Sequence, residues 1–332
     1  MDENQAEKRV FYQYFTQQEK AVYTALYNGV TQTMEYIELP YEIDVNTYEK
    51  IYVTLEKQEP EFFYLSYSFY TAEKVRTARI DYREGLSEAG SQKVLVENQA
   101  DEICNNLNST PSDFDKLLFI HDYIALNCSY VETGEEHLET VYGCLVNGSA
   151  NCEGYAKTFK YLCDKLDIPC VVTVGVTSDG VNHAWNQVQI NGEWYNVDVT
   201  WDDTEDELGV NHIYFLNSDF AFSDHRANVA FMPVFECLSD TQNFYHKKDL
   251  VISVQDDAER ILARELTDIN GALELKFTDN HSYSEFKNVY LENQRVFDLL
   301  FENNLMITQS EMKCVLKEYE QNLVLILQIS FI

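Results

Sequence analysis

The sequence predicts an α+β protein in which helices alternate with antiparallel strands. Over 152–166, apolar residues recur at every third or fourth position, which indicates a helix that buries one face. Residues 181–190 and 193–200 are strand-like, and Asn191-Gly192 between them is a strong signal for a two-residue hairpin turn. The C-terminal region follows a β-α-β-α-β-β order, which indicates a further small α+β domain.

The remaining elements follow from the same patterns in chain order. We expect helices over 4–28, 45–57, 87–107, 256–268 and 282–303, strands over 61–70, 75–83, 212–216, 250–254, 272–277, 313–319 and 323–331, and a loop over 130–146. A further helix begins near Thr110, which can cap it, with Pro111 at its first position. The chain then divides into an N-terminal helix and β-hairpin region (1–90), a central domain (91–240) and the small α+β domain (241–332).

Cys152 is predicted to lie in the first turn of its helix, after a run of small and polar residues. A helix N-terminus offers free backbone N–H groups and the positive end of the helix dipole. Such surroundings lower the pKa of a thiol from about 8.5 to roughly 3.5–7.5. We therefore expect a nucleophilic thiolate at Cys152, with the same N–H groups available to an oxyanion. We expect Cys152 to lie in a cleft, with the loop over 130–146 as one of its walls.

The hairpin supplies a base for this thiol. In the register that the turn sets, Ile190 lies opposite Glu193, and His183 and Asp198 become diagonal neighbours on one face. Their Cα atoms would be roughly 7–8 Å apart, within reach of an imidazole–carboxylate hydrogen bond. The spacing thus predicts a Cys-His-Asp triad. His225 is a second candidate base, but the spacing gives it no carboxylate partner, so we expect a structural role for it.

Three blocks of sequence carry a resemblance to a known family. The blocks are Asn151-Cys152-Glu153-Gly154-Tyr155, His183-Ala184-Trp185-Asn186 and the run from Trp194 to Asp203. Together they resemble the transglutaminase-like superfamily of papain-like cysteine enzymes, in its bacterial branch, over about a third of the chain. The resemblance implies a papain-like core, with the cysteine helix packed on an antiparallel sheet that bears the histidine and the aspartate. It also implies Cys152 as nucleophile, His183 as base and Asp198 as the carboxylate that orients the base.

One part of the site departs from the family. Animal transglutaminases carry a tryptophan upstream of the cysteine that helps to bind the oxyanion, whereas the three tryptophans of this chain all follow Cys152. Tyr142, Asn147 and Trp185 are therefore the candidates for the oxyanion site and the cleft. No acidic loop with calcium-ligand spacing is visible, so neither a metal nor a cofactor is predicted.

These features predict a cysteine-dependent amide-bond enzyme that acts on a protein or peptide through an acyl-thioenzyme. Without the upstream tryptophan or a calcium loop, hydrolysis by a peptidase or amide hydrolase is favoured over cross-linking. Two alternatives stay open. One is a true protein-glutamine transamidase, and the other is a catalytically silent module on the same fold that binds protein or peptidoglycan.

Composition limits the partners of the chain. With 24 basic and 56 acidic residues the net charge is −32, which disfavours nucleic acid and anionic membranes. The chain has no apolar run long enough to insert into a membrane. The acidic start of the sequence is not a signal peptide, so we expect a cytoplasmic protein, or an extracellular one if a leader was removed. The oligomeric state is left open.

The sequence contains eight cysteines, and none forms a C-x-x-C pair. Zinc-finger and redox-motif interpretations therefore have no support. Besides Cys152 we expect ordinary thiols, with one or two disulfides left open.

Overall fold

The computed structural model describes residues 1–70, 72–83, 88–107, 109, 112–134, 137–204, 209–229, 233–266, 272–303 and 312–331. The chain forms two compact units. The first contains Met1–Asp203 and Asn217–Ser239, and the second contains Thr204–Leu216 and Asp240–Ile332. The division into three regions that we draw from the sequence stays a prediction.

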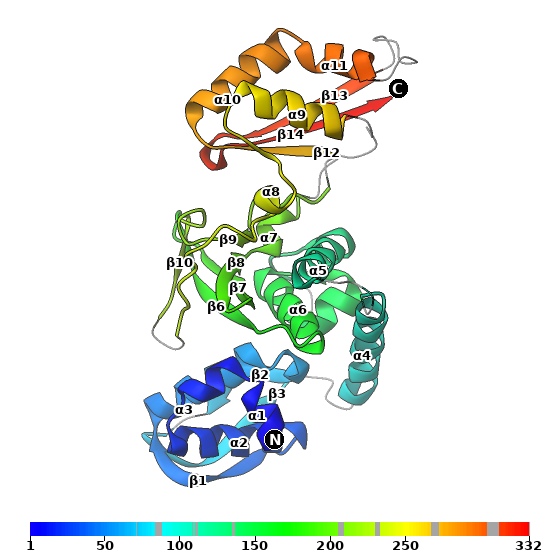
Figure 1. The fold of residues 1–332 in the computed structure, drawn as a ribbon. Helices are drawn as coiled ribbons and strands as arrows, with labels where there is room; N and C mark the ends of the chain where they lie inside the picture. The colour runs from blue at the N-terminus through cyan, green and yellow to red at the C-terminus, as the bar shows by residue number, and fades with distance from the viewer. Residues whose placement is uncertain are drawn as a thin grey trace. The chain divides into compact units, whose positions relative to one another are not determined.

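The first unit begins with a three-stranded sheet and the helices around it (Figure 1). Its elements are α1 (Glu3–Glu7), η1 (Val10–Tyr14), α2 (Gln17–Thr31), β1 (Tyr36–Asp44), α3 (Val45–Gln58), η2 (Pro60–Phe62), β2 (Leu65–Tyr70) and β3 (Lys74–Tyr82), with strand order β1-β3-β2. The single helix predicted over 4–28 is wrong, because Phe15 is extended and Thr16 starts α2 afresh with a capping box to Glu19. Strand β1 was not predicted, since it contains Pro40. It tolerates this proline because it is an edge strand whose pairing is irregular there.

Two helices and short connecting elements lead to Cys152. They are α4 (Ala89–Asn105), α5 (Asp113–Asn127), β4 (Ser129–Tyr130), the π-helix η4 (Gly143–Asn147) and β5 (Ser149–Ala150). Ser112 caps α5 by accepting a hydrogen bond from the backbone N–H of Asp115 at 3.1 Å. The predicted cap residues Thr110 and Pro111 lie outside the described residues. The region predicted as a loop therefore holds a short helix.

The central sheet has strand order β10-β6-β7-β8-β9. Its strands are β6 (Cys170–Thr177), β7 (Asn182–Ile190), β8 (Glu193–Val197), β9 (Phe215–Asn217) and β10 (His225–Ala227), and the helices beside them are α6 (Cys152–Lys165) and α7 (Val199–Asp202). The hairpin register is as predicted, with Ile190 opposite Glu193, and Asn191 and Gly192 both adopt positive φ. The predicted strand over 193–200 is too long, however. It ends at Val197, because Asp198 caps α7.

Helix α6 packs on this sheet through Ala156, which lies against Val172 and Ala184. Asn186 anchors the contact by donating a hydrogen bond from its side chain to the carbonyl of Ala156 at 2.9 Å. This is the arrangement expected of a papain-like core. It holds the first turn of α6 against the strand that bears His183.

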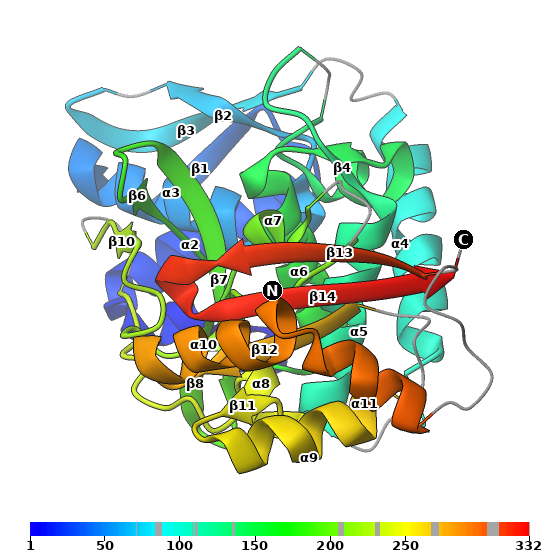
Figure 2. The same cartoon turned by 90° about the horizontal axis from the view of Figure 1, so that it is seen from above.

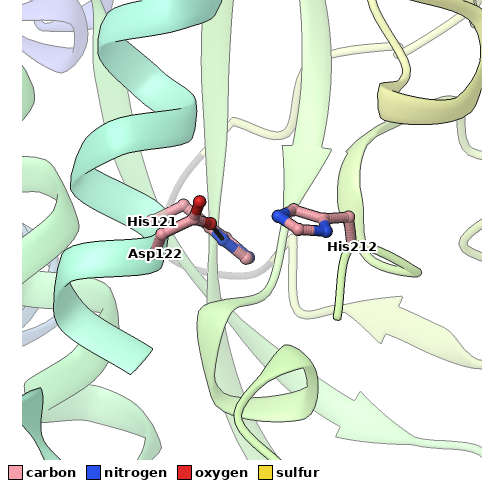
Figure 3. A group of neighbouring side chains, drawn as sticks. All are labelled: His121, Asp122 and His212. Carbon is pink, nitrogen blue, oxygen red and sulfur yellow. Dashed lines mark hydrogen bonds and ion pairs between the residues drawn. The ribbon is translucent and has the colours of Figure 1, made fainter. Parts of the chain in front are cut away.

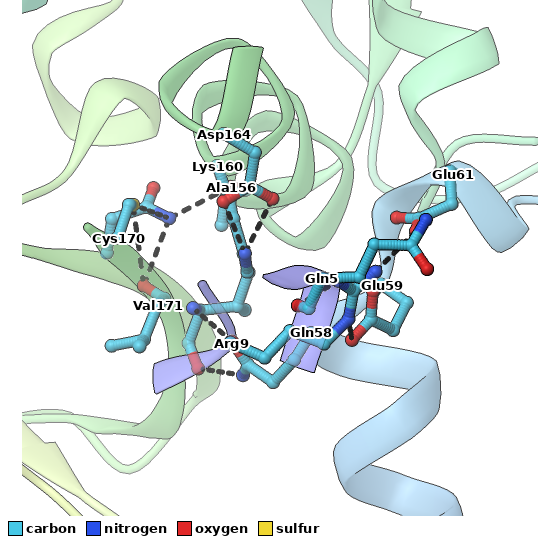
Figure 4. A network of polar contacts seen from close by, with 12 residues as sticks. Gln5, Arg9, Gln58, Glu59, Glu61, Ala156, Lys160, Asp164, Cys170 and Val171 are labelled. Atoms are coloured by element: carbon cyan, nitrogen blue, oxygen red, sulfur yellow. Dashed lines mark hydrogen bonds and ion pairs between the residues drawn. The ribbon is translucent and has the colours of Figure 1, made fainter. Parts of the chain in front are cut away.

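The N-terminal elements complete the edge of β6 beyond the three residues that pair with β10. The amide of Gln58 donates to the carbonyl of Val172 at 2.7 Å and accepts from its N–H at 3.0 Å, as a neighbouring strand would. Beside it, Arg9 bonds Glu59 and Glu61 (Figure 4). Burial, followed by the charge of Glu61, raises the pKa of Glu59 to about 8, although Arg9 opposes this rise.

The second unit is a four-stranded sheet of order β11-β12-β14-β13, and its three longer helices lie on one face (Figures 1 and 2). Its elements are α8 (Phe244–Lys247), β11 (Val251–Ile252), α9 (Gln255–Glu265), β12 (Ala272–Phe277), α10 (Asn280–Phe286), the π-helix η5 (Lys287–Glu292), α11 (Arg295–Asn303), β13 (Met312–Tyr319) and β14 (Val324–Phe331). The predicted order of elements is confirmed, except that the long helix over 282–303 is interrupted by Gln294, whose φ is positive. Within the described ranges, no helix is both long and apolar enough to cross a membrane.

Gly175 of β6 allows β10 to approach closely. A Cβ atom at Gly175 would lie 2.2 Å from the carbonyl oxygen of Arg226. We predict that Gly175→Ala lowers the free energy of unfolding by about 1–3 kcal/mol, the usual cost of overpacking, as measured by urea denaturation. Gly90→Ala is the matched control, because a Cβ at Gly90 meets open space on α4. That control should be neutral or stabilising, and equal destabilisation by both changes would contradict the prediction.

Candidate active site

Cys152 lies at the first position of α6, as predicted. Asn151 caps the helix, and its side-chain oxygen accepts from the N–H groups of Glu153 at 3.1 Å and Gly154 at 3.2 Å. The loop before the helix is held closely, since a Cβ at Gly154 would lie 2.2 Å from the carbonyl oxygen of Leu138. The cap therefore occupies two N–H groups that the sequence left available to an oxyanion.

His183 and Asp198 are joined by the predicted hydrogen bond, with 2.7 Å between Nε2 and Oδ2. Asp198 reaches His183 from the start of α7 and not as a strand neighbour. The other carboxylate oxygen, Oδ1, accepts from the backbone N–H groups of Thr200 at 3.0 Å and Trp201 at 3.3 Å. The cap of a four-residue helix thus fixes the rotation of the carboxylate.

The electrostatics of this pair follow from its burial. Burial raises the pKa of Asp198, but the charge of His183 and hydrogen bonds from His183 and His225 hold it well below its usual range. Burial lowers the pKa of His183, but the Asp198 carboxylate and hydrogen bonds to Asp198 and Cys152 raise it to about 10. Because Nε2 of His183 faces Asp198, Nδ1 remains for the thiol of Cys152. The structure thus brings together the three predicted triad residues, whose catalytic roles stay predictions.

Cys152 and His183 open into a cleft of about 950 Å³. The lining comes from α3, α6, β6, β7 and β10 and from residues beside them. It mixes polar side chains, such as Asn151, Glu153, Asn182, Arg226 and Asn228, with apolar ones, such as Val53 and Val174. We expected residues 130–146 to form one wall, but of these only Glu139 lines the cleft among the described residues. Helix α3 takes that place.

The α3 wall carries a group of four charges that sequence analysis missed. Lys57 lies 2.6 Å from Glu153 and 3.0 Å from Glu56, and Lys157 lies 2.7 Å from Glu153 and 2.5 Å from Glu56. The two lysines and Glu56 are buried. Burial raises the pKa of Glu153, but Lys157 and Lys57 lower it to about 2. The one sequence pattern that could have predicted this group is the helical spacing of α3, which places Glu56 and Lys57 near the apolar face of the helix.

His225 was expected to have no carboxylate partner, and this expectation is wrong. Its Nε2 lies 3.1 Å from Oδ2 of Asp198, and its Nδ1 lies 2.8 Å from Oδ1 of Asp224. His183, Asp198 and His225 each offer a ligand atom within 4.8 Å of the others, a spacing that could hold a metal ion. Asp198 already bonds both histidines. Sequence analysis missed the contact because β10 reaches the site through sheet pairing.

The three candidates for the oxyanion site do not line the cleft. Tyr142 stacks on Phe63, with 5.9 Å between ring centroids, and Asn147 is exposed at the end of η4. Trp185 is buried beside the two imidazoles of the site, and its ring lies 5.1 Å from that of His225. Among the described residues, the backbone N–H of Cys152 donates to no backbone carbonyl.

Tyr130 is a further residue that sequence analysis missed. It lies on β4 and pairs with Ala150 of β5, and Ala150 stands two residues before Cys152. Burial, followed by the charges of Cys152, Glu132 and Asp198, raises the pKa of Tyr130.

His121 on α5 is a further buried histidine, and it lies outside the lining of the cleft. His121 bonds Asp122 at 2.9 Å (Figure 3) and Asp202 at 3.1 Å. It therefore ties α5 to the end of α7 and lines no part of the cleft. In the second unit, His212 likewise bonds Glu274, with 2.6 Å between Nδ1 and Oε1.

Seven of the eight cysteines have described side chains, and all seven are free thiols. Among them only Cys104 and Cys152 are partly exposed. The disulfides that the sequence left open are therefore absent from this described set. Cys314 lies outside it.

Part of the chain is similar to known proteins. Residues 100–199 match the model of the transglutaminase-like superfamily. Kyphoscoliosis peptidase of Mus musculus is 27% identical over 156 residues, which cover 42% of this chain and 24% of that protein. The Homo sapiens protein of the same name is 24% identical over 153 residues, which cover 41% and 23%. This chain thus spans about a quarter of the length of these relatives.

A solved structure titled as that of a TGase also overlaps. It covers 52% of this chain and 52% of its own, with 15% identity and a TM-score of 0.32. A score this low carries no argument about the present chain.

The charged group on the α3 wall generates a prediction about pH and stability. Since the pKa of Glu153 is lowered in the folded protein, its stabilising effect is present above about pH 4.3 and is lost as the pH falls towards 2. Glu153→Gln should therefore lower the free energy of unfolding by roughly 2–4 kcal/mol at pH 7, and by less at pH 3. Urea denaturation of both proteins at the two pH values measures this. A pH-independent difference would contradict the assigned ion pairs.

Cys152 should react faster than every other described thiol. It is partly exposed, opens into the cleft and has the His183 imidazole beside it. Cys104 is the matched internal control, because it is also partly exposed while burial raises its pKa. At pH 6 we expect iodoacetamide to modify Cys152 at least tenfold faster than Cys104, as followed by peptide mapping. Equal rates would show that Cys152 is not activated.

Proposed function

This chain is a protein of the transglutaminase-like superfamily, and on that premise we propose that it hydrolyses amide bonds of proteins or peptides through an acyl-thioenzyme on Cys152. One observation carries the proposal. A partly exposed thiol at a helix N-terminus faces a histidine that is hydrogen-bonded to a buried aspartate, and the thiol and the histidine both line one cleft. These are the nucleophile, base and orienting group that acyl transfer requires.

In the first half of the reaction the thiolate of Cys152 attacks the carbonyl carbon of the substrate. The imidazolium of His183 then gives its Nδ1 proton to the leaving amine as the C–N bond breaks. Asp198 holds Nε2 throughout, so the imidazole keeps the orientation that the transfer needs. The backbone N–H of Cys152 is the donor for the tetrahedral oxyanion.

In the second half, water attacks the thioester. Neutral His183 takes a proton from this water, the new C–O bond forms, and the C–S bond breaks to return the thiolate. The carboxylic acid product then leaves. His183 ends as the imidazolium, so the cycle is closed without a cofactor taking part.

The lining of the cleft favours hydrolysis over transfer. A transamidase must admit an amine while it excludes water, which is present at about 55 M and otherwise competes on concentration alone. Charged and amide side chains of α3, α6 and β10 line the cleft beside Cys152. Such a surface is hydrated, and water therefore has access to the thioester.

We predict that the purified protein, given a peptide pool and a large excess of a primary amine, yields cleaved or deamidated peptides and few amine adducts. Mass spectrometry distinguishes the products, since deamidation adds about 1 Da and an adduct adds the mass of the amine. Cys152→Ala should abolish all products.

Asp198→Asn tests the orienting carboxylate, and we expect it to reduce turnover by about 10⁴-fold, as in serine triads.

Other outcomes would replace this proposal. Cys152-dependent amine adducts as the main product would identify a transamidase. A protein with a fast-reacting Cys152 that forms no product of either kind would favour the binding-module alternative.

A further inference from the structure

His225 lies next to the triad and contacts it at the carboxylate. Oδ2 of Asp198 receives two imidazole nitrogens, Nε2 of His183 at 2.7 Å and Nε2 of His225 at 3.1 Å. The two rings are 5.4 Å apart between centroids. One oxygen atom is therefore shared by the base and by a second histidine.

The surroundings of His225 determine its protonation. Nε2 faces Asp198 and Nδ1 faces Asp224, so both ring nitrogens meet a carboxylate oxygen and both must donate. Its side chain is fully buried. His183 and three aromatic side chains, Trp185, Trp201 and Phe222, also lie against the ring. An imidazolium donates to both partners, and its single positive charge is shared between the two carboxylates.

A shared carboxylate holds each partner less strongly. The mechanism proposed above needs His183 to carry a proton and then to release it to the leaving amine. If Asp198 served His183 alone, its full negative charge would oppose that release. A second cationic donor on the same oxygen reduces this attraction.

We propose that His225 is a positioning residue of the triad, which shares the Asp198 carboxylate with His183 and so limits how strongly that carboxylate retains the His183 proton. The catalytic purpose of this arrangement rests on the proposed function. The sharing of one Asp198 oxygen by the two histidines is seen in the structure without a substrate. A residue that only filled space would leave the titration of His183 unchanged.

The test is the titration of His183, followed by NMR in protein labelled with ¹⁵N-histidine. His225→Phe keeps an aromatic ring but removes both hydrogen bonds and the charge. We expect it to raise the pH at which His183 loses its proton by on the order of one unit. His225→Gln keeps a donor for Asp198 and removes the charge, so we expect a smaller rise in the same direction. At pH 10 both variants should hold more protonated His183 than the unaltered protein.

His121→Gln is the matched control, because His121 is also buried and also lies between two carboxylates, yet does not touch Asp198. It should leave the His183 titration in place. An unchanged or lowered His183 midpoint in folded His225→Gln would overturn the proposal, whether or not His225→Phe folds. Failure of the proposed function would appear separately, as slow alkylation of Cys152 in the unaltered protein.

Discussion

The site depends on a single buried carboxylate that has several donors. Asp198 accepts two imidazole nitrogens on one oxygen and two backbone N–H groups on the other. A buried anion without such partners would cost several kcal/mol and would be neutralised by protonation. Here the donors come from β7, from the start of α7 and from β10. The folding of all three elements is thus coupled to the charge at the centre of the site.

The sequence was most informative where a structure is set by neighbouring residues. The Asn191-Gly192 turn fixed the hairpin register, and the helix from Cys152 followed from its apolar period. These features predicted the thiol, the imidazole and the carboxylate, and the predicted contact between His183 and Asp198 is present. The predicted geometry of Asp198 was wrong in one respect. Asp198 was predicted to lie on a strand beside His183, whereas it caps helix α7. Aspartate is also a preferred helix-capping residue, so its position in the sequence fits either place.

Features that depend on distant parts of the chain were not predictable in this way. His225 contacts Asp198 because β10 pairs with β6 over three residues, a pairing that no local pattern encodes. The lysines and glutamates beside the cleft come from α3 and α6, whose positions in the sequence differ by about a hundred residues. The oxyanion candidates failed for the same reason, since nearness to Cys152 in sequence did not bring Tyr142 or Asn147 to its side. Helix α3 lies before the segment that matches the superfamily, so one wall of the cleft comes from outside that segment.

The discontinuity of the first unit has a consequence for biosynthesis. The chain leaves this unit after Asp203 and returns at Asn217, so the strand that carries His225 is made after the excursion. Asp198 and His225 are 27 residues apart in sequence. During translation the thiol, the base and their carboxylate therefore emerge from the ribosome before the second imidazole. Through that interval a nascent chain can already hold the three triad residues while Asp198 still lacks one of its donors.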